Sequence, residues 1–148
     1  MDNEQIIRNA YKIAENKDIE GWLAAFTSDG TFTDESIGVT YRGGDRAFPL
    51  ENFGRAFSDM HRELYRFYVD GDVVVVQLAL QGTHDGPLRV AGGVLEPTGN
   101  RIDAPCCDVF ELADGKIKRF DCYPSGTVIL VQLSVLGALD AAVRPDAA

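Results

Sequence analysis

The apolar pattern of this chain changes its period once, near His61, and this change constrains the fold more than any other feature. Before it, apolar residues recur three and four positions apart, as on one face of a helix. After it, they alternate with polar residues in long segments separated by short turns, as in antiparallel strands. Helices followed by hairpins predict an α+β fold in one domain rather than a parallel, doubly wound one.

The first half of the chain predicts three helices. The first spans residues 3–16, and Asp18 can cap a second by accepting a hydrogen bond from the first turn. A third begins near Pro49, because proline is tolerated only in a first turn. A short strand at 31–34 lies between the last two helices. Buried positions on the second and third helices are expected to include Trp22, Phe26, Leu50, Phe53, Phe57 and Met60.

The second half predicts four long strands, joined in pairs by Asp-Gly turns that are typical of β-hairpins. Between the pairs, residues 86–99 contain Gly and Pro and interrupt the sheet. For residues 126–139, whose composition is ambiguous, we predict a helix. The domain is expected to span 1–140, and 141–148 to be a disordered tail. The strands are expected at 64–69, 73–83, 102–112 and 116–123.

An excess of acidic side chains limits the partners of this protein, since 23 acidic residues against 14 basic ones give a net charge of −9. Such a surface repels phosphate backbones and anionic lipids, so we expect no nucleic acid and no membrane partner. The longest apolar run, 128–133, is far shorter than the ~18 residues of a membrane span. The polar N-terminus is unlike a signal peptide, so a cytoplasmic location is expected.

The cysteines and histidines of the chain predict neither a disulfide framework nor a metal site. Cys106, Cys107 and Cys122 are an odd number with one adjacent pair, and we expect reduced thiols. Two histidines without the spacing of ligands argue against bound metal. Because motifs for nucleotides, phosphates and activated nucleophiles are absent too, no cofactor is expected.

Strand alternation places Asp108 on an apolar face. Even-numbered positions from 102 to 112 share one side of their strand, and they include Cys106 and Phe110. A carboxyl group there loses hydration, so its pKa is expected to rise. A neutral carboxylic acid can donate a hydrogen bond to a developing oxyanion. The alternative is an acid that only anchors a nearby amide or hydroxyl.

Two further residues are candidates for acid–base chemistry. Asp34 follows Phe32 by two positions and could act as a general base, although a turn-forming role competes with it. His84 follows Leu80 in strand phase and could be an acid or base at the pocket mouth, or a residue that hydrogen-bonds the next loop. The expected pocket lining is Trp22, Phe26, Phe57, Met60, Tyr65, Leu80, Cys106 and Phe110.

Short segments in a fixed order resemble the nuclear transport factor 2-like superfamily, and within it the SnoaL-like and ketosteroid-isomerase-like proteins. The resemblance covers about residues 5–136. It implies a cone-shaped α+β barrel of the cystatin-like type, with three N-terminal helices on a curved, mostly antiparallel sheet that encloses a pocket. It also implies a homodimer. The segments are Asp18-Ile19-Glu20-Gly21-Trp22, Phe32-Thr33-Asp34, Tyr41-Arg42-Gly43, Gly82-Thr83-His84-Asp85-Gly86, Pro97-Thr98-Gly99, Asp108-Val109-Phe110, Asp114-Gly115-Lys116-Ile117 and Gln132-Leu133.

The resemblance also implies roles for individual residues. Asp34 matches the general base of ketosteroid isomerases, and Asp108 matches the protonated aspartate of their oxyanion hole. Their third member, a tyrosine on the first helix, would fall on Ala10 by spacing, with Tyr11 one residue away and facing elsewhere. The resemblance to the steroid isomerases is therefore incomplete. The segments around His84 and residues 97–99 are more similar to SnoaL-like cyclases, which form enolates for aldol ring closure.

The leading hypothesis is a SnoaL-like isomerase or cyclase that removes a proton next to a carbonyl group of a small hydrophobic substrate, without a cofactor. Asp34 would be the base, Asp108 the hydrogen-bond donor, and His84 a second acid or base. One alternative is a non-catalytic module for ligand binding or dimerisation. Another is an epoxide-hydrolase-like enzyme, in which Arg89 or Arg119 would complete an Asp-Arg-Asp set around a water.

Overall fold

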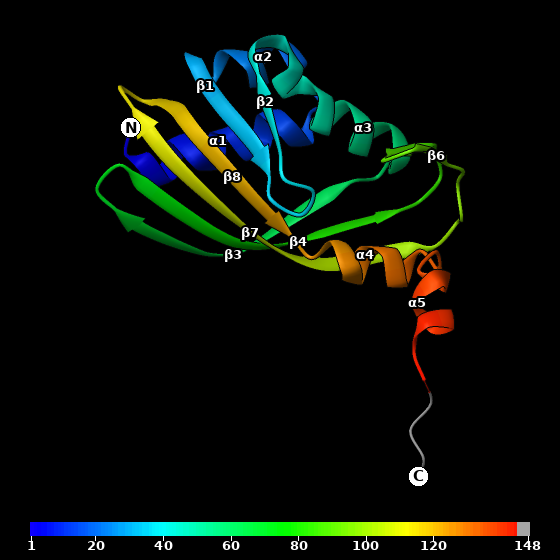
Figure 1. The fold of residues 1–148 in the computed structure, drawn as a ribbon. Coiled ribbons are helices and arrows are strands. Elements are labelled where there is room, and N and C mark those ends of the chain that lie inside the picture. Colours follow the sequence, from blue (N-terminus) through cyan, green and yellow to red (C-terminus); the bar gives the residue numbers. More distant parts are fainter. Residues whose placement is uncertain (145–148) are drawn as a thin grey trace.

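The computed structural model describes residues 1–144, in which a curved sheet wraps around three N-terminal helices (Figure 1). The helices are α1 (Asn3–Glu15), α2 (Ile19–Ala24) and α3 (Phe48–Ala56), and a 3-10 helix, η1 (Gly43–Ala47), precedes α3. They cover the concave face of the sheet, which confirms the predicted α+β architecture. In this described part of the chain, no helix is long and apolar enough to cross a membrane.

The sheet has six strands in the order β2-β1-β8-β7-β4-β3, whereas the sequence predicted four long strands and a short one at 31–34. It is mixed, because one pair of neighbouring strands is parallel. The expected hairpins β3–β4 and β7–β8 are present and antiparallel. The expected strand at 31–34 is the end of a longer one, β1, which pairs in parallel with β8. Its partner β2 is a short, mostly exposed edge strand without apolar alternation, so the sequence did not predict it. The strands are β1 (Phe26–Asp34), β2 (Val39–Arg42), β3 (His61–Asp70), β4 (Val73–Thr83), β7 (Arg101–Ala113) and β8 (Lys116–Pro124).

Both short helices end earlier than the sequence predicted. Asp18 caps α2 as expected, since its carboxylate accepts from the amide of Gly21 at 2.9 Å. Phe26, expected on the face of this helix, instead opens β1, because pairing with β8 brings the Ile117 amide 2.9 Å from the Ala25 carbonyl. Tertiary pairing thus overrides the helical pattern at this point. Phe57 likewise has an extended backbone just beyond α3 and stays buried.

The segment after the sheet is helical, as predicted, but in two pieces. They are α4 (Gly126–Gln132) and α5 (Gly137–Ala142), and Ser134 between them has a left-handed backbone, with φ 61°. Helix α4 is hydrogen-bonded to the start of β7, since the Gln132 side chain accepts from the Asp103 amide at 2.8 Å. Of the expected tail, 141 and 142 end α5, and 145–148 lie outside the described residues. The interruption at 86–99 holds a small hairpin of β5 (Leu88–Val90) and β6 (Gly93–Leu95).

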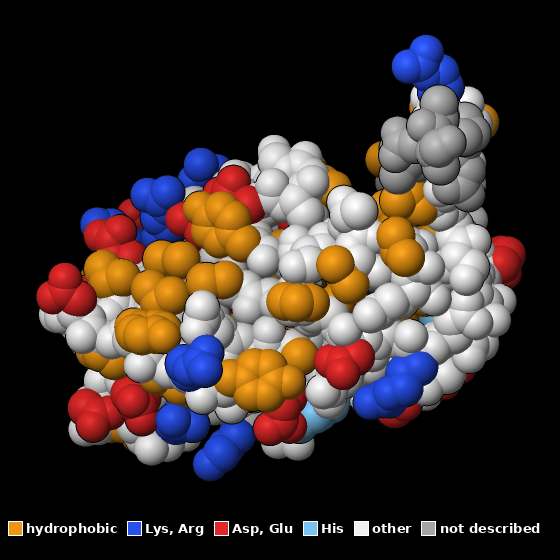
Figure 2. All heavy atoms as spheres, turned by 90° about the horizontal axis from the view of Figure 1, so that it is seen from below, with side chains coloured by type: hydrophobic (Ala, Val, Ile, Leu, Met, Phe, Trp, Pro, Cys, Tyr) orange, Lys and Arg blue, Asp and Glu red, His pale blue; other side chains and the backbone are white. Residues whose placement is uncertain are grey.

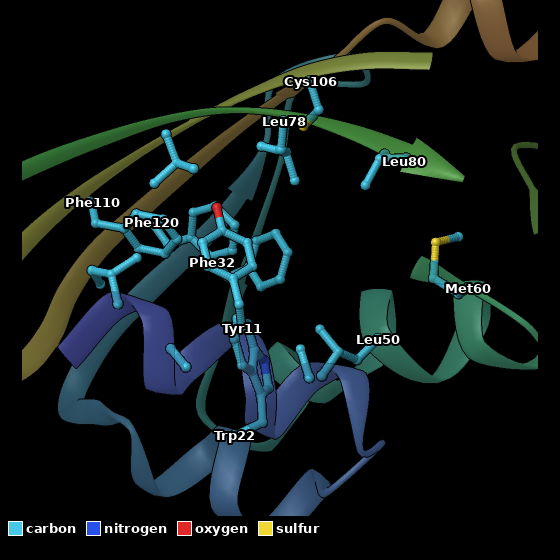
Figure 3. Close-up of a cluster of buried hydrophobic side chains, with 14 of the residues drawn as sticks. Tyr11, Trp22, Phe32, Leu50, Met60, Leu78, Leu80, Cys106, Phe110 and Phe120 are labelled. Atoms are coloured by element: carbon cyan, nitrogen blue, oxygen red, sulfur yellow. The ribbon is translucent and has the colours of Figure 1, made fainter. Parts of the chain in front are cut away.

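Aromatic side chains from the sheet and the helices form the core beneath the cavity (Figure 3). The rings of Phe110 and Phe120 stack with their centroids 4.3 Å apart, and Phe32 lies at the same distance from Phe120. Trp22 meets Phe120 edge-on at 6.0 Å, and its indole donates to the Arg46 carbonyl at 3.1 Å. This cluster fixes α2 against the sheet, because aromatic contacts of this geometry add to the gain from burial.

Candidate active site

A narrow cavity of about 60 Å³ lies between the helices and the concave face of the sheet. Most of its wall is apolar. Apart from two thiols and the Trp22 indole, its polar groups are those of Tyr11, Asp34, Arg62 and Asp108. The other lining residues are Ala14, Trp22, Phe32, Pro49, Leu50, Phe53, Met60, Leu80, Cys106, Phe120, Cys122 and Pro124. An apolar cavity with a few convergent polar groups is the usual form of a small-molecule site.

Asp108 and Tyr11 form a hydrogen-bonded pair at the floor of this cavity. The Tyr11 hydroxyl donates to Asp108 Oδ2 at 2.6 Å, and the Cys106 thiol donates to Oδ1 at 3.3 Å. Only 3% of Asp108 is exposed, and Tyr11 is buried too. Strand alternation therefore predicted the orientation of Asp108 correctly, since positions 102, 104, 106, 108 and 110 are all buried.

Tyr11 points into the cavity, so the expectation that it faces elsewhere is wrong. Positions 7, 10, 11 and 14 make up the buried face of α1, and Tyr11 lies at its centre. Its ring meets Phe110 edge-on at 5.9 Å, and Figure 3 shows its hydroxyl directed toward the strands. Spacing of three and four from Ile7 and Ala14 could have predicted this orientation from the sequence alone.

Burial dominates the electrostatics of the pair. It raises the pKa of Asp108, although hydrogen bonds from Tyr11, Cys122 and Cys106 and the charge of Arg62 act in the opposite direction. Burial, with the neighbouring Asp108 carboxyl group, also raises the pKa of Tyr11 well above its usual range. Both groups are thereby favoured in their protonated forms, in which each has a hydrogen to donate.

Asp34 lines the same cavity and lies in one cross-strand row with Asp108. Asp34 pairs with Cys122 in the β1–β8 ladder, and Cys122 pairs with Asp108 in the β8–β7 ladder. Because neighbouring strands are ~4.8 Å apart, the Cα atoms of the two acids are separated by about 10 Å. Oδ1 of Asp34 accepts from the Ser36 amide at 2.9 Å and from the Ser36 hydroxyl at 2.6 Å. The turn-forming role is therefore real, and within the described residues Oδ2 has no such partner.

His84 is not among the residues that line the cavity, so its expected place at the pocket mouth is wrong. It is fully buried beyond the end of β4, with its ring 5.4 Å from that of Phe57. Nδ1 accepts from the Thr98 amide at 3.1 Å, which joins β4 to the loop before β7. Burial lowers the pKa of this imidazole. These contacts match the alternative of a histidine that holds the neighbouring loop.

The predicted lining is half correct. Trp22, Met60, Leu80 and Cys106 do line the cavity. Three others belong to the core behind it, namely Phe26, Phe57 and Phe110. Tyr65 is 59% exposed on the outer face of β3, since it follows Leu64, which packs inward against the core.

Arg62 is a cavity residue that the sequence did not suggest, and it lies at the start of β3. Its guanidinium is 3.6 Å from Glu15, whose carboxylate also accepts from the Arg62 amide at 2.8 Å. Arg89 and Arg119, the expected candidates for an Asp-Arg-Asp set, do not line the cavity. Arg119 instead donates to Asp121 at 2.8 Å, away from the cavity.

Two thiols flank Asp108. Cys106 on β7 and Cys122 on β8 have their sulfur atoms 3.7 Å apart, and both line the cavity. The sequence placed only Cys106 on the face of Asp108, because the register between β7 and β8 could not be deduced. Together with Asp108 they form a group of three residues whose side-chain donor atoms lie within 4.8 Å of one another.

Comparison with known proteins gives a consistent result. The family model of the SnoaL-like domain matches residues 7–120. A search of curated proteins finds no significant match. Three solved structures resemble the chain over nearly their whole length.

A candidate SnoaL-like polyketide cyclase from Jannaschia sp. CCS1 has 23% identity and a TM-score of 0.76, over 89% of this chain and 91% of that one. A protein with a ketosteroid isomerase-like fold from Catenulispora acidiphila has 18% identity and a TM-score of 0.73, over 95% and 97%. IdmH, a candidate polyketide cyclase from Streptomyces antibioticus, has 19% identity and a TM-score of 0.72, over 91% and 100%. Likeness at these identities establishes the fold and leaves the activity to be argued from the site.

Proposed function

The chain belongs to the SnoaL-like domain family, and on this premise we propose that it is a cofactor-independent isomerase or cyclase acting on a small hydrophobic carbonyl compound. The observation that carries the proposal is the buried Tyr11–Asp108 hydrogen bond of 2.6 Å in an apolar cavity that Asp34 also lines. A base and an oxyanion-binding pair that line one cavity are the two parts that proton abstraction next to a carbonyl requires.

In this mechanism the substrate carbonyl oxygen lies against Tyr11 and Asp108. Oδ2 of Asp34 removes a proton from the neighbouring carbon, and the electron pair of that C–H bond moves toward the carbonyl oxygen. On substrate binding the Tyr11 hydroxyl turns its hydrogen from Asp108 Oδ2 to the carbonyl oxygen, and protonated Asp108 donates its own hydrogen beside it. These two hydrogen bonds stabilise the resulting enolate without the hydrogens becoming fully transferred. The separation of about 10 Å between the Cα atoms of the two acids leaves room for a few substrate bonds between their side chains.

The second step distinguishes the two reactions. In an isomerisation, protonated Asp34 returns the proton to a different carbon of the enolate. In a cyclisation, the enolate carbon attacks a second carbonyl of the same molecule, and protonated Asp34 gives its proton to the new alkoxide. Neither step requires a redox change, and the acids and the phenol of the cavity supply the proton transfers that both reactions need.

The lining favours a small, apolar substrate that displaces side chains on entry. A volume of about 60 Å³ is far below the ~300–1,000 Å³ of typical ligand sites, so binding requires part of the wall to move. Met60 lies in this wall just beyond α3, and its unbranched thioether can adopt several shapes at low cost.

Turnover of 3-cyclohexen-1-one to its conjugated isomer tests the proposal, since the product absorbs in the ultraviolet and the reaction needs only proton transfer. Asp34→Asn is expected to slow turnover by roughly 10²–10⁴-fold, the usual contribution of a general base. Asp29→Asn is the matched control, because Asp29 is an exposed acid on the same strand. If Asp34→Asn and Asp108→Ala both keep the wild-type rate, the mechanism is wrong.

The non-catalytic alternative predicts binding without turnover. 4-Nitrophenol is a suitable probe, because its phenolate mimics an enolate oxygen and changes colour with its charge. Binding of this phenol that depends on Tyr11, without any isomerisation or exchange of α-protons in deuterium oxide, would favour a binding module.

The epoxide-hydrolase-like alternative needs an arginine between two acids, and Arg62 is the cavity arginine available for it. Its contact with Glu15 rather than with Asp34 or Asp108 makes that reaction the less favoured one.

We also propose that two copies associate through the outer face of the sheet, in a reducing, cytoplasmic setting. Figure 2 shows hydrophobic side chains gathered on the face opposite the helices. They include Tyr65, Tyr68, Val73 and Tyr123, each more than a third exposed. Covering such a patch with a second copy removes apolar area from water. Light scattering should report a dimer that Tyr65→Glu weakens.

The acidic charge and the reduced cysteines support the remaining expectations of no nucleic acid, no membrane partner and a cytoplasmic location.

A further inference from the structure

We propose that Cys106, Cys122 and Asp108 form a binding site for one thiophilic divalent cation, of the class of Zn²⁺, at the floor of the cavity. The three side chains come from two adjacent strands, with the cysteines on different strands and Asp108 paired directly with Cys122. Their donor atoms lie within 4.8 Å of one another and all face the same enclosed space. Binding at this site goes beyond the proposed reaction and does not depend on it.

Two of the three distances between the donor atoms match those around a tetrahedral ion. Two sulfur ligands at about 2.3 Å from one Zn²⁺ lie roughly 3.8 Å apart, and an oxygen ligand at about 2.0 Å lies roughly 3.5 Å from each sulfur. The two sulfur atoms here are 3.7 Å apart, and the Cys106 sulfur is 3.3 Å from Asp108 Oδ1. The sheet therefore holds two of the three donor distances near the spacing that coordination requires. The third, between Asp108 and the Cys122 sulfur, is within 4.8 Å and closes by a rotation of the Asp108 side chain.

The nature of the donors selects the class of ion. Two thiolates favour Zn²⁺, Cd²⁺ or Cu⁺ over Mg²⁺ and Ca²⁺, which prefer sites made only of oxygen. A cavity of about 60 Å³ is small for an organic ligand, but it holds an ion with one water in the fourth position. Two thiolates and a carboxylate around a divalent ion carry one net negative charge. Arg62 in the same wall, which also pairs with Glu15, offsets part of it.

Binding of the cation releases protons and changes the role that Asp108 can have in the proposed reaction. Each thiol loses its proton to solvent as its sulfur coordinates, so at least two protons are released per ion. The carboxylate of Asp108 becomes a ligand and is no longer able to donate a hydrogen bond to an oxyanion. Zn²⁺ should therefore inhibit the proton-transfer reaction wherever that reaction exists.

Titration of the reduced, desalted full-length protein with Cd²⁺ tests the site directly. The expected result is one Cd²⁺ per chain, with the ultraviolet charge-transfer absorption of thiolate–cadmium bonds and release of protons to a pH indicator. Cys106→Ser and Cys122→Ser should each weaken binding by at least ~10-fold, because even residues that only orient metal ligands contribute that much.

Cys107→Ser is the matched control. Cys107 is the third free cysteine, and it alternates to the opposite side of β7, so its loss should leave affinity and absorption unchanged. Circular dichroism of each variant checks that the fold is kept. The site is refuted if wild-type protein gives no thiolate–cadmium band, or if the band survives in both Cys106→Ser and Cys122→Ser. It is equally refuted if Cys107→Ser removes the band. These readouts need no turnover, so they separate the metal site from the proposed reaction.

Discussion

The hydroxyl of Tyr11 on α1 donates a 2.6 Å hydrogen bond to Asp108 on β7, across 97 positions of the chain. This contact joins the helical layer to the centre of the sheet at the floor of the cavity. Burial favours the protonated form of both groups, and an apolar wall keeps their dipoles from being screened by water. The pair is therefore suited to stabilise charge that develops on a bound oxygen atom.

Replacing Tyr11 with Phe should lower kcat for 3-cyclohexen-1-one by about 10²-fold, with a smaller effect on KM, since one donor to the oxyanion is lost. Steady-state kinetics measure this directly. Tyr123→Phe serves as the control, because Tyr123 is 48% exposed and does not line the cavity. A Tyr11→Phe enzyme with the wild-type kcat would show that the hydroxyl has only a structural role.

His84 should make folding stability depend on pH on the acidic side. Because burial lowers the pKa of its ring, the unfolded chain binds a proton below about pH 6.5 that the folded chain excludes. The contribution of His84 to the free energy of unfolding should therefore be level above that pH and fall as the pH decreases below it. Urea unfolding from pH 5 to 8 measures the slope, and His84→Asn should reduce it.

His61 provides a control of opposite sign. Hydrogen bonds with Glu63 and Glu15 raise the pKa of its ring, so its contribution is complete below about pH 6.5 and is lost as the pH rises through the folded value. His61→Gln should remove that loss and leave the acidic slope intact. An acidic slope that survives His84→Asn would contradict the structural role assigned to this histidine.

Gly86 should not tolerate a side chain, although its backbone is not left-handed. A Cβ atom there would collide with the backbone carbonyl oxygen of Arg55, at the end of α3. Gly86→Ala should lower the free energy of unfolding by about 1–3 kcal/mol, the usual cost of overpacking. Gly44→Ala, where nothing lies near the added atom, should change it by less than ~0.5 kcal/mol. Equal stability of the two variants in urea would show that the loop can shift freely.

Phe110 should be among the most costly core residues to truncate. It is 1% exposed, stacks on Phe120 and supports the ring of Tyr11. Phe110→Ala should cost about 3–5 kcal/mol in urea unfolding. Val73→Ala on the outer side of the neighbouring strand β4 is the matched control, since Val73 is 37% exposed. A loss below ~1 kcal/mol in Phe110→Ala would mean that the surrounding rings collapse into the space.

Much of the fold could be predicted because periodicity is a local property. Spacing of three and four predicted α1, and alternation predicted the hairpins and the inward side of Asp108. The same rule, applied to Ile7, Ala10 and Ala14, would also have predicted that Tyr11 faces the core. The spacing of the ketosteroid isomerases matches Ala10 instead, one position before the tyrosine that faces the core.

Other features depend on which elements meet in space. The parallel pairing of β1 with β8 turned Phe26 from a helix residue into a strand residue and placed Asp34 in one row with Asp108. The register of β7 against β8 brought the Cys122 sulfur to 3.7 Å from that of Cys106. The bulge in β3 brought Leu64 and Phe67, three positions apart, onto the same buried side. Periodicity shows which side of a helix or strand is apolar. Which strands and helices pair across long stretches of sequence depends on side-chain packing and on satisfying the backbone hydrogen bonds of the whole chain.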